Sequence, residues 1–191
     1  MDDLPPDEEL LRRARKGDAA AFARVYERHR DVVFRFAARL CGSPDTAEDV
    51  THDCFLALVT GPDRFDPGRS ALRTYLCAAA RNQVFKRLRA ASRAPGLLED
   101  DVADAEVNLP LQINRAAAVQ AALAALAPLQ REAVVLVEYE GCTLAETAAI
   151  TGAEVGTVKA RLHRARTALR RMLAAHDERP RPRAAAGGCH E

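Results

Sequence analysis

The 191-residue sequence contains no tryptophan, and aromatic residues make up only 5% of it. It also lacks any apolar run near the roughly 20 residues that a membrane-spanning helix requires. Its first residues are acidic and polar, unlike those of a signal peptide. The five cysteines are an odd number without CxxC spacing, and a free cysteine in apolar surroundings behaves as a small hydrophobic residue. These absences predict a cytoplasmic protein with reduced thiols and no membrane insertion.

Short motifs of enzymes and metal sites are missing as well. The sequence has no HExxH, GxGxxG or P-loop motif, and its five histidines are scattered without the cysteine–histidine spacing of a metal site. Cys189 and His190 are neighbours near the C-terminus, but two ligands do not make a metal site. We therefore expect no catalytic residues, no cofactor and no metal. Metal or redox sensing at Cys189 and His190 is the alternative within this class.

What the sequence does contain favours α-helix almost throughout. Apolar residues make up 48% of the chain and charged residues 29%, which is ordinary for a globular protein. Alanine, leucine, arginine and glutamate are abundant, and β-branched residues are not clustered. Apolar residues recur with the helical period in segments 7–16, 18–40, 44–60, 70–91, 113–127, 128–137, 144–150 and 155–173. The predicted fold class is all-α.

The helical pattern breaks between residues 93 and 108. This segment contains Pro95-Gly96 and five acidic residues against one arginine, with little periodic apolar content, which is typical of a linker. The end of the chain is rich in proline, arginine and glycine, which predicts an unpacked tail. The predicted organisation is two small helical domains, 1–92 and 113–174, joined by a flexible acidic linker, 93–112, and followed by a disordered tail, 175–191. We expect the two domains to fold separately.

The formal net charge of +1 hides a strong segregation of charge. Residues 69–93 contain seven basic residues and no acidic one, whereas residues 42–63 contain five acidic residues and no lysine or arginine. Adjacent segments of opposite charge predict two partners of opposite charge. The alternatives are a basic face that is only solvated and acidic residues that only stabilise a helix N-terminus.

Residues 144–162 have the pattern of a helix-turn-helix, with a short helix, a tight turn at Gly152 and a second, amphipathic helix. In the second helix we expect one apolar stripe to pack inward, namely Val155, Val158, Leu162, Ala165 and Leu169. The other faces carry side chains that can reach bases and phosphates, namely Thr157, Lys159, Arg161, His163 and Arg164. An amphipathic helix with a solvated basic face is the alternative interpretation.

A helix-turn-helix alone does not identify a protein, but four further motifs precede it in a fixed order. They are AEDVTHDCF at 47–55, RFDPGR at 64–69, LRTYLCAAARN at 72–82 and LAPLQREA at 126–133. In order and spacing, these motifs resemble the extracytoplasmic-function class of bacterial RNA polymerase sigma factors, from about Leu10 to Leu173. The resemblance implies a sigma region 2 helical bundle in 1–92 and a sigma region 4 helix-turn-helix domain in 113–174.

The resemblance also implies a role for each group of residues. In this class the acidic helix of region 2 binds a coiled coil of the polymerase's largest subunit, which implies docking by Glu48, Asp49, His52, Asp53 and Phe55. The basic segment is implied to read and melt the −10 promoter element through Arg69, Arg73, Tyr75, Asn82, Lys86 and Arg89. Region 4 is implied to read the −35 element through Thr157, Lys159, Arg161, His163 and Arg164, and to contact the flap region of the second-largest subunit. Core RNA polymerase and promoter DNA are therefore the expected partners, and an anti-sigma factor is a further candidate.

Some positions depart from the pattern of the class. Tyr75 stands where tryptophan is usual, and Cys77 stands where an aromatic residue is usual. A reduced aromatic platform bears on which promoter sequence is read, and leaves the class unchanged. Two alternatives from other classes are a helix-turn-helix regulator that acts without core polymerase and a helical bundle that binds other proteins. Stoichiometric co-purification with core polymerase distinguishes a sigma factor from both.

Overall fold

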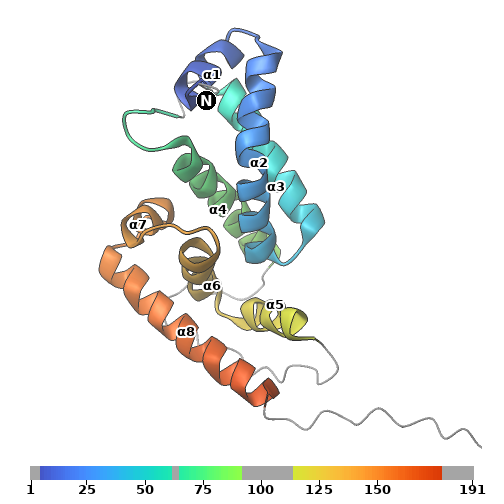
Figure 1. The fold of residues 1–191 in the computed structure, drawn as a ribbon, viewed down its shortest axis with the longest axis vertical. Coiled ribbons are helices and arrows are strands. Elements are labelled where there is room, and N and C mark those ends of the chain that lie inside the picture. Colours follow the sequence, from blue (N-terminus) through green and yellow to red (C-terminus); the bar gives the residue numbers. More distant parts are fainter. Residues whose placement is uncertain (1–4, 62–64, 92–113, 178–191) are drawn as a thin grey trace, which may run out of the picture.

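The computed structural model describes residues 5–61, 65–91 and 114–177, and within these ranges every regular element is helical (Figure 1). The all-α prediction is therefore confirmed. The N-terminal half contains α1 (Asp7–Ala14), α2 (Ala19–Cys41), α3 (Pro44–Thr60) and α4 (Leu72–Ala91). The C-terminal half contains α5 (Arg115–Ala125), α6 (Pro128–Val134), the π-helical turn η2 (Val135–Tyr139), α7 (Leu144–Thr151) and α8 (Val155–Asp177). The helix predicted at 128–137 thus changes to π-helical geometry halfway.

Side-chain caps explain why several helices begin where they do. Asp18 accepts a hydrogen bond from the backbone N–H of Ala21 at 3.0 Å and so caps α2. Ser43 accepts one from the backbone N–H of Thr46 at 3.3 Å, with a proline in the first turn of α3. These oxygens satisfy N–H groups that have no partner within the helix. The caps therefore fix the starts of the two helices that form the centre of the N-terminal half.

The N-terminal half packs around α2. This helix lies against α1, α3 and α4, and its inner face is buried over most of its length. The core combines aromatic rings with aliphatic side chains, and Phe36, Phe55 and Phe85 are each at most 1% exposed. Asp7 holds α1 against α2 through an ion pair with Arg28 at 2.6 Å.

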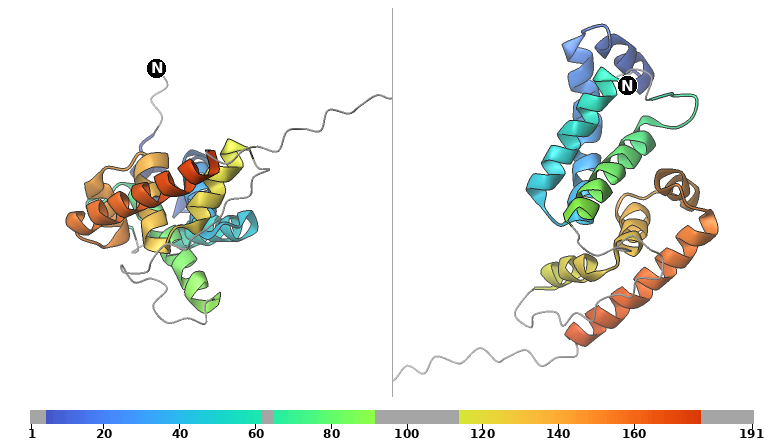
Figure 2. Two further views of the ribbon diagram at one scale, coloured as in Figure 1. Left: turned by 90° about the horizontal axis from the view of Figure 1, so that it is seen from below. Right: turned by 180° about the vertical axis from the view of Figure 1, so that it is seen from behind.

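The C-terminal half packs along one face of the long helix α8. Helices α5, α6 and α7 all contact it, and the views in Figure 2 show α8 spanning this half from end to end. The core of this half is built from small and aliphatic side chains, namely Ala118, Ala122, Leu123, Leu126, Ala133, Val134, Leu162, Ala165, Ala168 and Met172. Helix α8 continues through Asp177, which extends it into the segment that was predicted as tail.

The two halves contact each other. Helix α4 packs against α7, and α2 packs against α5, α6 and η2. Five buried residues of the C-terminal half belong to the same apolar cluster as the core of the N-terminal half, namely Leu129, Val135, Leu136, Cys142 and Ile150. We call this contact region the seam. The predicted linker, 93–112, lies outside the described residues, as does the predicted tail beyond residue 177. Among the helices that the structure describes, none has the length and apolar character to cross a bilayer.

Candidate nucleic-acid and partner-binding surfaces

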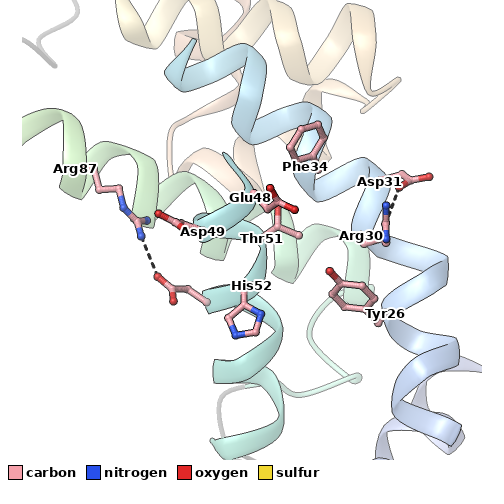
Figure 3. A pocket seen from close by; sticks show the side chains of 10 residues that line it. Tyr26, Arg30, Asp31, Phe34, Glu48, Asp49, Thr51, His52 and Arg87 are labelled. Carbon is pink, nitrogen blue, oxygen red and sulfur yellow. Dashed lines mark hydrogen bonds and ion pairs between the residues drawn. The ribbon is translucent and has the colours of Figure 1, made fainter. Parts of the chain in front are cut away.

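The acidic residues of α3 lie beside a surface cavity of about 620 Å³ between α2 and α3 (Figure 3). Glu48, Asp49 and His52 are exposed on the rim, and Asp53 is half-buried. Opposite them, α2 contributes two aromatic side chains, Tyr26 and Phe34, of which Phe34 is 37% exposed. We call this surface the acidic face. It brings together four of the five residues that were predicted for polymerase docking.

Phe55, the fifth predicted docking residue, is only 1% exposed, which corrects its assignment as a contact residue. Its ring packs edge-on against the ring of Tyr26, with the centroids 4.8 Å apart. Phe55 follows Thr51 by four residues, and Thr51 is also buried, so both lie on the inward side of α3. Phe55 therefore supports the acidic face from behind.

Two cations line the acidic face, Arg30 of α2 and Arg87 of α4. Arg87 reaches across from α4 and its Nη2 lies 3.0 Å from Oδ2 of Asp53, as the dashed line in Figure 3 shows. Both side chains are more than one third exposed, so this pair contributes little to stability and can exchange for other partners. Among the described residues that line it, the face combines four acids and two arginines with two partly exposed aromatic rings. This chemistry suits a partner segment that carries basic and apolar side chains together.

A second cavity, of about 300 Å³, lies between α3 and α4. Three residues predicted for the −10 element line it together, namely Tyr75, Asn82 and Lys86. Tyr75 is half-buried, and its ring lies 5.3 Å from the ring of Phe65, while Asn82 and Lys86 are exposed. We call this the base cavity. An aromatic ring, an amide and an ammonium group around one cavity can stack, hydrogen-bond and neutralise a nucleotide.

The other three residues predicted for the −10 element lie elsewhere. Arg69 is exposed in the turn before α4, and Arg89 is exposed in its last turn. Arg73 is turned towards the C-terminal half, where its Nη2 donates to the backbone oxygen of Glu140. The structure thus brings together only half of the predicted −10 residues, because α4 presents basic side chains on more than one face.

On α8, the predicted DNA-contacting residues also divide into accessible and buried side chains. Lys159 and His163 are exposed and Thr157 and Arg164 are half-buried, but Arg161 is only 8% exposed. The prediction that Arg161 projects away from the apolar stripe is therefore wrong. Residue 161 lies three positions after Val158 and four before Ala165, both fully buried, and this spacing places it on the inward face.

The expected apolar stripe of α8 is largely confirmed. Val158, Leu162 and Ala165 are buried, and Leu169 packs against the core of the C-terminal half. Val155 is the exception, since it is 38% exposed in the first turn of the helix. Helix α7 begins with a capping box between Thr143 and Glu146 and ends at Gly152, whose φ of 69° gives the tight turn of a helix-turn-helix.

Two buried glutamates at the seam were not predicted. The side chain of Glu132 in α6 is 0% exposed and accepts a hydrogen bond from Nε of Arg81. The side chain of Glu140, just after η2, is 2% exposed and lies 3.1 Å from Nη1 of Arg39. Burial raises the pKa of Glu132 to about 7, while Arg81 acts in the opposite direction. In the sequence, Glu132 lies three residues after Leu129 and four before Leu136, which places it on the apolar face of the helix, and this spacing was the available signal.

The cysteines are unpaired at Cys41, Cys54, Cys77 and Cys142. Burial raises the pKa of both Cys54 and Cys77 to about 12, so these thiols stay protonated and unreactive at neutral pH. No cluster of three or more possible metal ligands occurs among the described residues. Cys189 and His190 lie outside them.

Comparison with known families assigns both halves. Residues 25–94 match the family Sigma-70 region 2, and residues 116–169 match the family Sigma-70, region 4. A relative from Mycobacterium tuberculosis, the ECF RNA polymerase sigma factor SigM, is 35% identical over 167 residues, with 87% of this chain and 84% of the relative covered. The ECF RNA polymerase sigma factor SigE of Mycolicibacterium smegmatis is 36% identical over 170 residues. This match covers 84% of this chain and 65% of that relative.

Solved structures of similar fold agree with this assignment. CnrH in complex with the cytosolic domain of CnrY matches with a TM-score of 0.65 and 31% identity, covering 88% of this chain and 97% of that chain. The sigma factor RpoE in complex with the anti-sigma factor NepR from Bartonella quintana matches with a TM-score of 0.63 and 28% identity, covering 80% of this chain and 96% of that chain. The chain therefore belongs to the extracytoplasmic-function class of RNA polymerase sigma factors.

Proposed function

We propose that the two halves of this sigma factor divide promoter recognition as follows. The acidic face of α2 and α3 docks on the coiled coil of the polymerase's largest subunit, and the base cavity takes unstacked bases of the −10 element. Helices α7 and α8 read the −35 duplex and lie near the flap region of the second-largest subunit. The chain thereby lets core RNA polymerase start transcription at specific promoters, and the segments 1–92 and 113–174 act as its two working units, joined by 93–112.

The base cavity is the single observation that carries this proposal. Tyr75, Asn82 and Lys86 are seven and four residues apart, which is close to whole helical turns, so they lie in one row along α4. Cys54 and Ala57 of α3 also line the cavity. A row of aromatic, amide and cationic groups along one cavity suits bases that have left the helical stack, as in a melted −10 element.

The partners follow from the chemistry of the surfaces. On the acidic face, the aromatic side chains Tyr26 and Phe34 supply contact area, and Glu48 and Asp49 select a basic partner. We include an anti-sigma factor among the partners, since the Bartonella quintana relative was solved with one. The protein consumes no cofactor in this proposal and works in the cytoplasm beside the polymerase, which itself performs the nucleotide chemistry.

Transcription in vitro with core RNA polymerase tests the proposal. We expect Asn82→Ala combined with Lys86→Ala to lower promoter opening more than tenfold, because hydrogen bonds and phosphate attraction to the separated strand are lost together. Co-purification with core polymerase should stay unchanged, since the acidic face is intact. The matched control is Glu27→Gln, an exposed residue of α2 away from both cavities. Full promoter opening by the folded double variant would refute the assignment of the base cavity.

A further inference from the structure

The seam between the two halves has a charge pattern that promoter recognition does not explain. On its N-terminal side, four arginines meet the C-terminal half, namely Arg35, Arg39, Arg73 and Arg81. On its C-terminal side stand the two buried carboxylates, Glu132 and Glu140. Each of the four ion pairs that these side chains form across the seam therefore runs from a cation of the N-terminal half to an acid of the C-terminal half.

Glu140 is surrounded by cations from two helices. Its carboxylate lies 3.1 Å from Arg39, 3.9 Å from Arg73 and 4.0 Å from Arg35. Arg39 also lies over the ring of Tyr139, with its guanidinium carbon 4.6 Å from the ring centre. A carboxylate that is 2% exposed needs such partners, because an unpaired buried charge is strongly unfavourable.

Glu132 makes the second connection, further along α4. Its Oε1 accepts from Arg81, whose guanidinium carbon lies 4.8 Å from the ring centre of Phe85. Its Oε2 is buried and has no hydrogen-bond partner in the described part of the chain. Arg161 of α8 is close enough to act on the charge of Glu132. The Glu132 carboxylate thus links α4 to the recognition helix, α8.

Apolar and backbone contacts support the same arrangement. Arg131 donates from Nη1 to the backbone oxygen of Leu40 at 2.9 Å, at the end of α2. The buried side chains of Leu129, Leu136 and Ile150 pack into the core of the N-terminal half. Apolar burial supplies the favourable free energy of the contact. The paired charges select one docking geometry, since any other would leave buried ions without partners.

We propose that Glu132 and Glu140 form a latch that holds the free chain in a closed arrangement, which cannot engage the two promoter elements together. This inference rests on the proposed function for its consequence, but the latch itself is a property of the chain alone. The latch opens when the C-terminal half leaves the seam, which frees the four arginines.

The distance between the promoter elements explains why closure is incompatible with recognition. The positions −35 and −10, by which the two elements are named, lie about 25 base pairs apart, which is roughly 85 Å at 3.4 Å per base pair. Helix α8, the longest element of the C-terminal half at 23 residues, is only about 35 Å long. With α7 packed against α4, the recognition helix cannot reach the −35 element while the base cavity holds the −10 element.

Peptide-resolved labelling of thiols with a maleimide tests the latch on the full chain. Cys142 is 8% exposed and lies in the cluster that joins the halves, whereas Cys54 is 2% exposed inside the N-terminal half. We expect Glu132→Gln combined with Glu140→Gln to speed labelling of Cys142 at least tenfold, while Cys54 stays protected. The matched control is Glu138→Gln, because Glu138 pairs with Arg166 inside the C-terminal half and should leave both rates unchanged.

The outcomes separate opening from unfolding. Unchanged protection of Cys142 in the double variant would overturn the latch, and so would fast labelling of Cys142 in the unaltered chain, because the closed arrangement would then be unoccupied. If Cys54 becomes reactive as well, the double variant has unfolded, and Arg39→Gln decides instead. Arg39 is 23% exposed and pairs with Glu140 from the N-terminal half. Faster labelling of Cys142 in Arg39→Gln would support the latch, and unchanged protection of Cys142 would overturn it.

The labelling needs neither DNA nor polymerase, so it tests the latch independently of the proposed function. Initiation in vitro by the unaltered chain with core polymerase tests the proposed function by itself. Faster labelling of Cys142 without initiation would support the latch and refute the function. Initiation by the unaltered chain, together with unchanged labelling of Cys142 in the double variant and in Arg39→Gln, would support the function and refute the latch.

Discussion

The two halves of the molecule differ in how they form their cores. Every phenylalanine and all tyrosines except Tyr139 lie in the N-terminal half, whose core contains three fully buried rings. The core of the C-terminal half is built from alanine, leucine, valine and Met172. Aromatic side chains bury far more area than alanine does, so the N-terminal half has the larger core. The C-terminal half buries part of its own apolar surface only at the seam.

This difference implies a one-sided dependence. The N-terminal half can keep its core when the seam opens, because Phe36, Phe55 and Phe85 pack with residues of the same half. When the seam opens, Leu129 and Leu136 of the C-terminal half become exposed to solvent, because they are buried in the cluster of the other half. We therefore expect a substitution in the core of the N-terminal half to destabilise both halves. A substitution in the core of the C-terminal half should destabilise that half alone.

The largest expected effect comes from Phe36→Ala. Phe36 is 0% exposed in α2, and removing a buried ring should lower the free energy of unfolding by about 3–5 kcal/mol. Hydrogen exchange should show reduced protection in both halves, because the seam is lost with the core. Phe34→Ala, two residues earlier and 37% exposed, is the matched control and should cost far less.

The reverse experiment uses Leu123→Ala in α5, where the side chain is 2% exposed. This substitution should cost about 2–5 kcal/mol, but only amides of the C-terminal half should lose protection. If exchange in α2 and α3 rose as much as exchange in α5 and α8, the one-sided dependence would be wrong and the chain would be a single cooperative unit.

The next effect is a pH dependence at the seam. The ordinary pKa of a glutamate is near 4.5, and burial raises that of Glu132 to about 7, with Arg81 from α4 and Arg161 from α8 facing it. Between these values the folded protein keeps a proton that the unfolded chain has released. The free energy of unfolding should therefore fall as the pH rises from about 4.5 to 7 and stay level above that, by at most about 3 kcal/mol.

Urea unfolding of the unaltered chain and of Glu132→Gln, at about pH 5 and about pH 8, measures this contribution. The glutamine variant cannot titrate at this position, so its stability should fall less over the same interval. The carboxyls whose pKa is lowered, such as Asp18 and Glu146, titrate below this interval and affect both proteins equally. Parallel pH profiles for the two proteins would show that Glu132 is ionised throughout.

Much of the fold could be predicted because it depends on local patterns. The spacing of apolar residues and the sequence Ser43-Pro44 predict where α2 ends and α3 begins, and the structure agrees. The residues of the base cavity share one face because Tyr75, Asn82 and Lys86 are separated by nearly whole turns. Region 42–63 predicted a surface of one charge, and the structure gathers three of its acids, Glu48, Asp49 and Asp53, along α3 beside a cavity.

What could not be predicted depends on contacts between distant segments. Nothing local indicates that Arg73 faces Glu140 or that Arg81 faces Glu132, since each pair joins helices from different halves. The run of basic residues in α4 covers several faces of the helix, and only the packing decides which face is free. Arg161 is a different kind of error, because its spacing from Val158 already placed it on the buried face.

A smaller effect compares one helix cap in each half. Ser43 caps α3, and Thr143 caps α7 through a capping box in which Glu146 Oε2 lies 2.8 Å from the backbone nitrogen of Thr143. Either substitution to alanine should cost about 1 kcal/mol of stability. Only Thr143→Ala should weaken binding of −35 duplex, because α7 positions the recognition helix. Equal losses of duplex binding in both variants would argue against this difference between the halves.

The smallest expected effect concerns single cations of the recognition helix. Lys159 is exposed on α8, so Lys159→Ala should leave the stability unchanged and weaken duplex binding on all sequences. The loss of one phosphate contact should lower the salt dependence of binding by about one unit of slope.

Arg161→Ala should instead reduce stability before it affects duplex binding, since Arg161 is buried beside Glu132 in the closed arrangement. Fluorescence anisotropy of a −35 duplex across a salt series, paired with thermal unfolding, separates the two effects. A flatter salt slope for Arg161→Ala with unchanged stability would mean that Arg161 is turned to DNA in solution rather than towards Glu132.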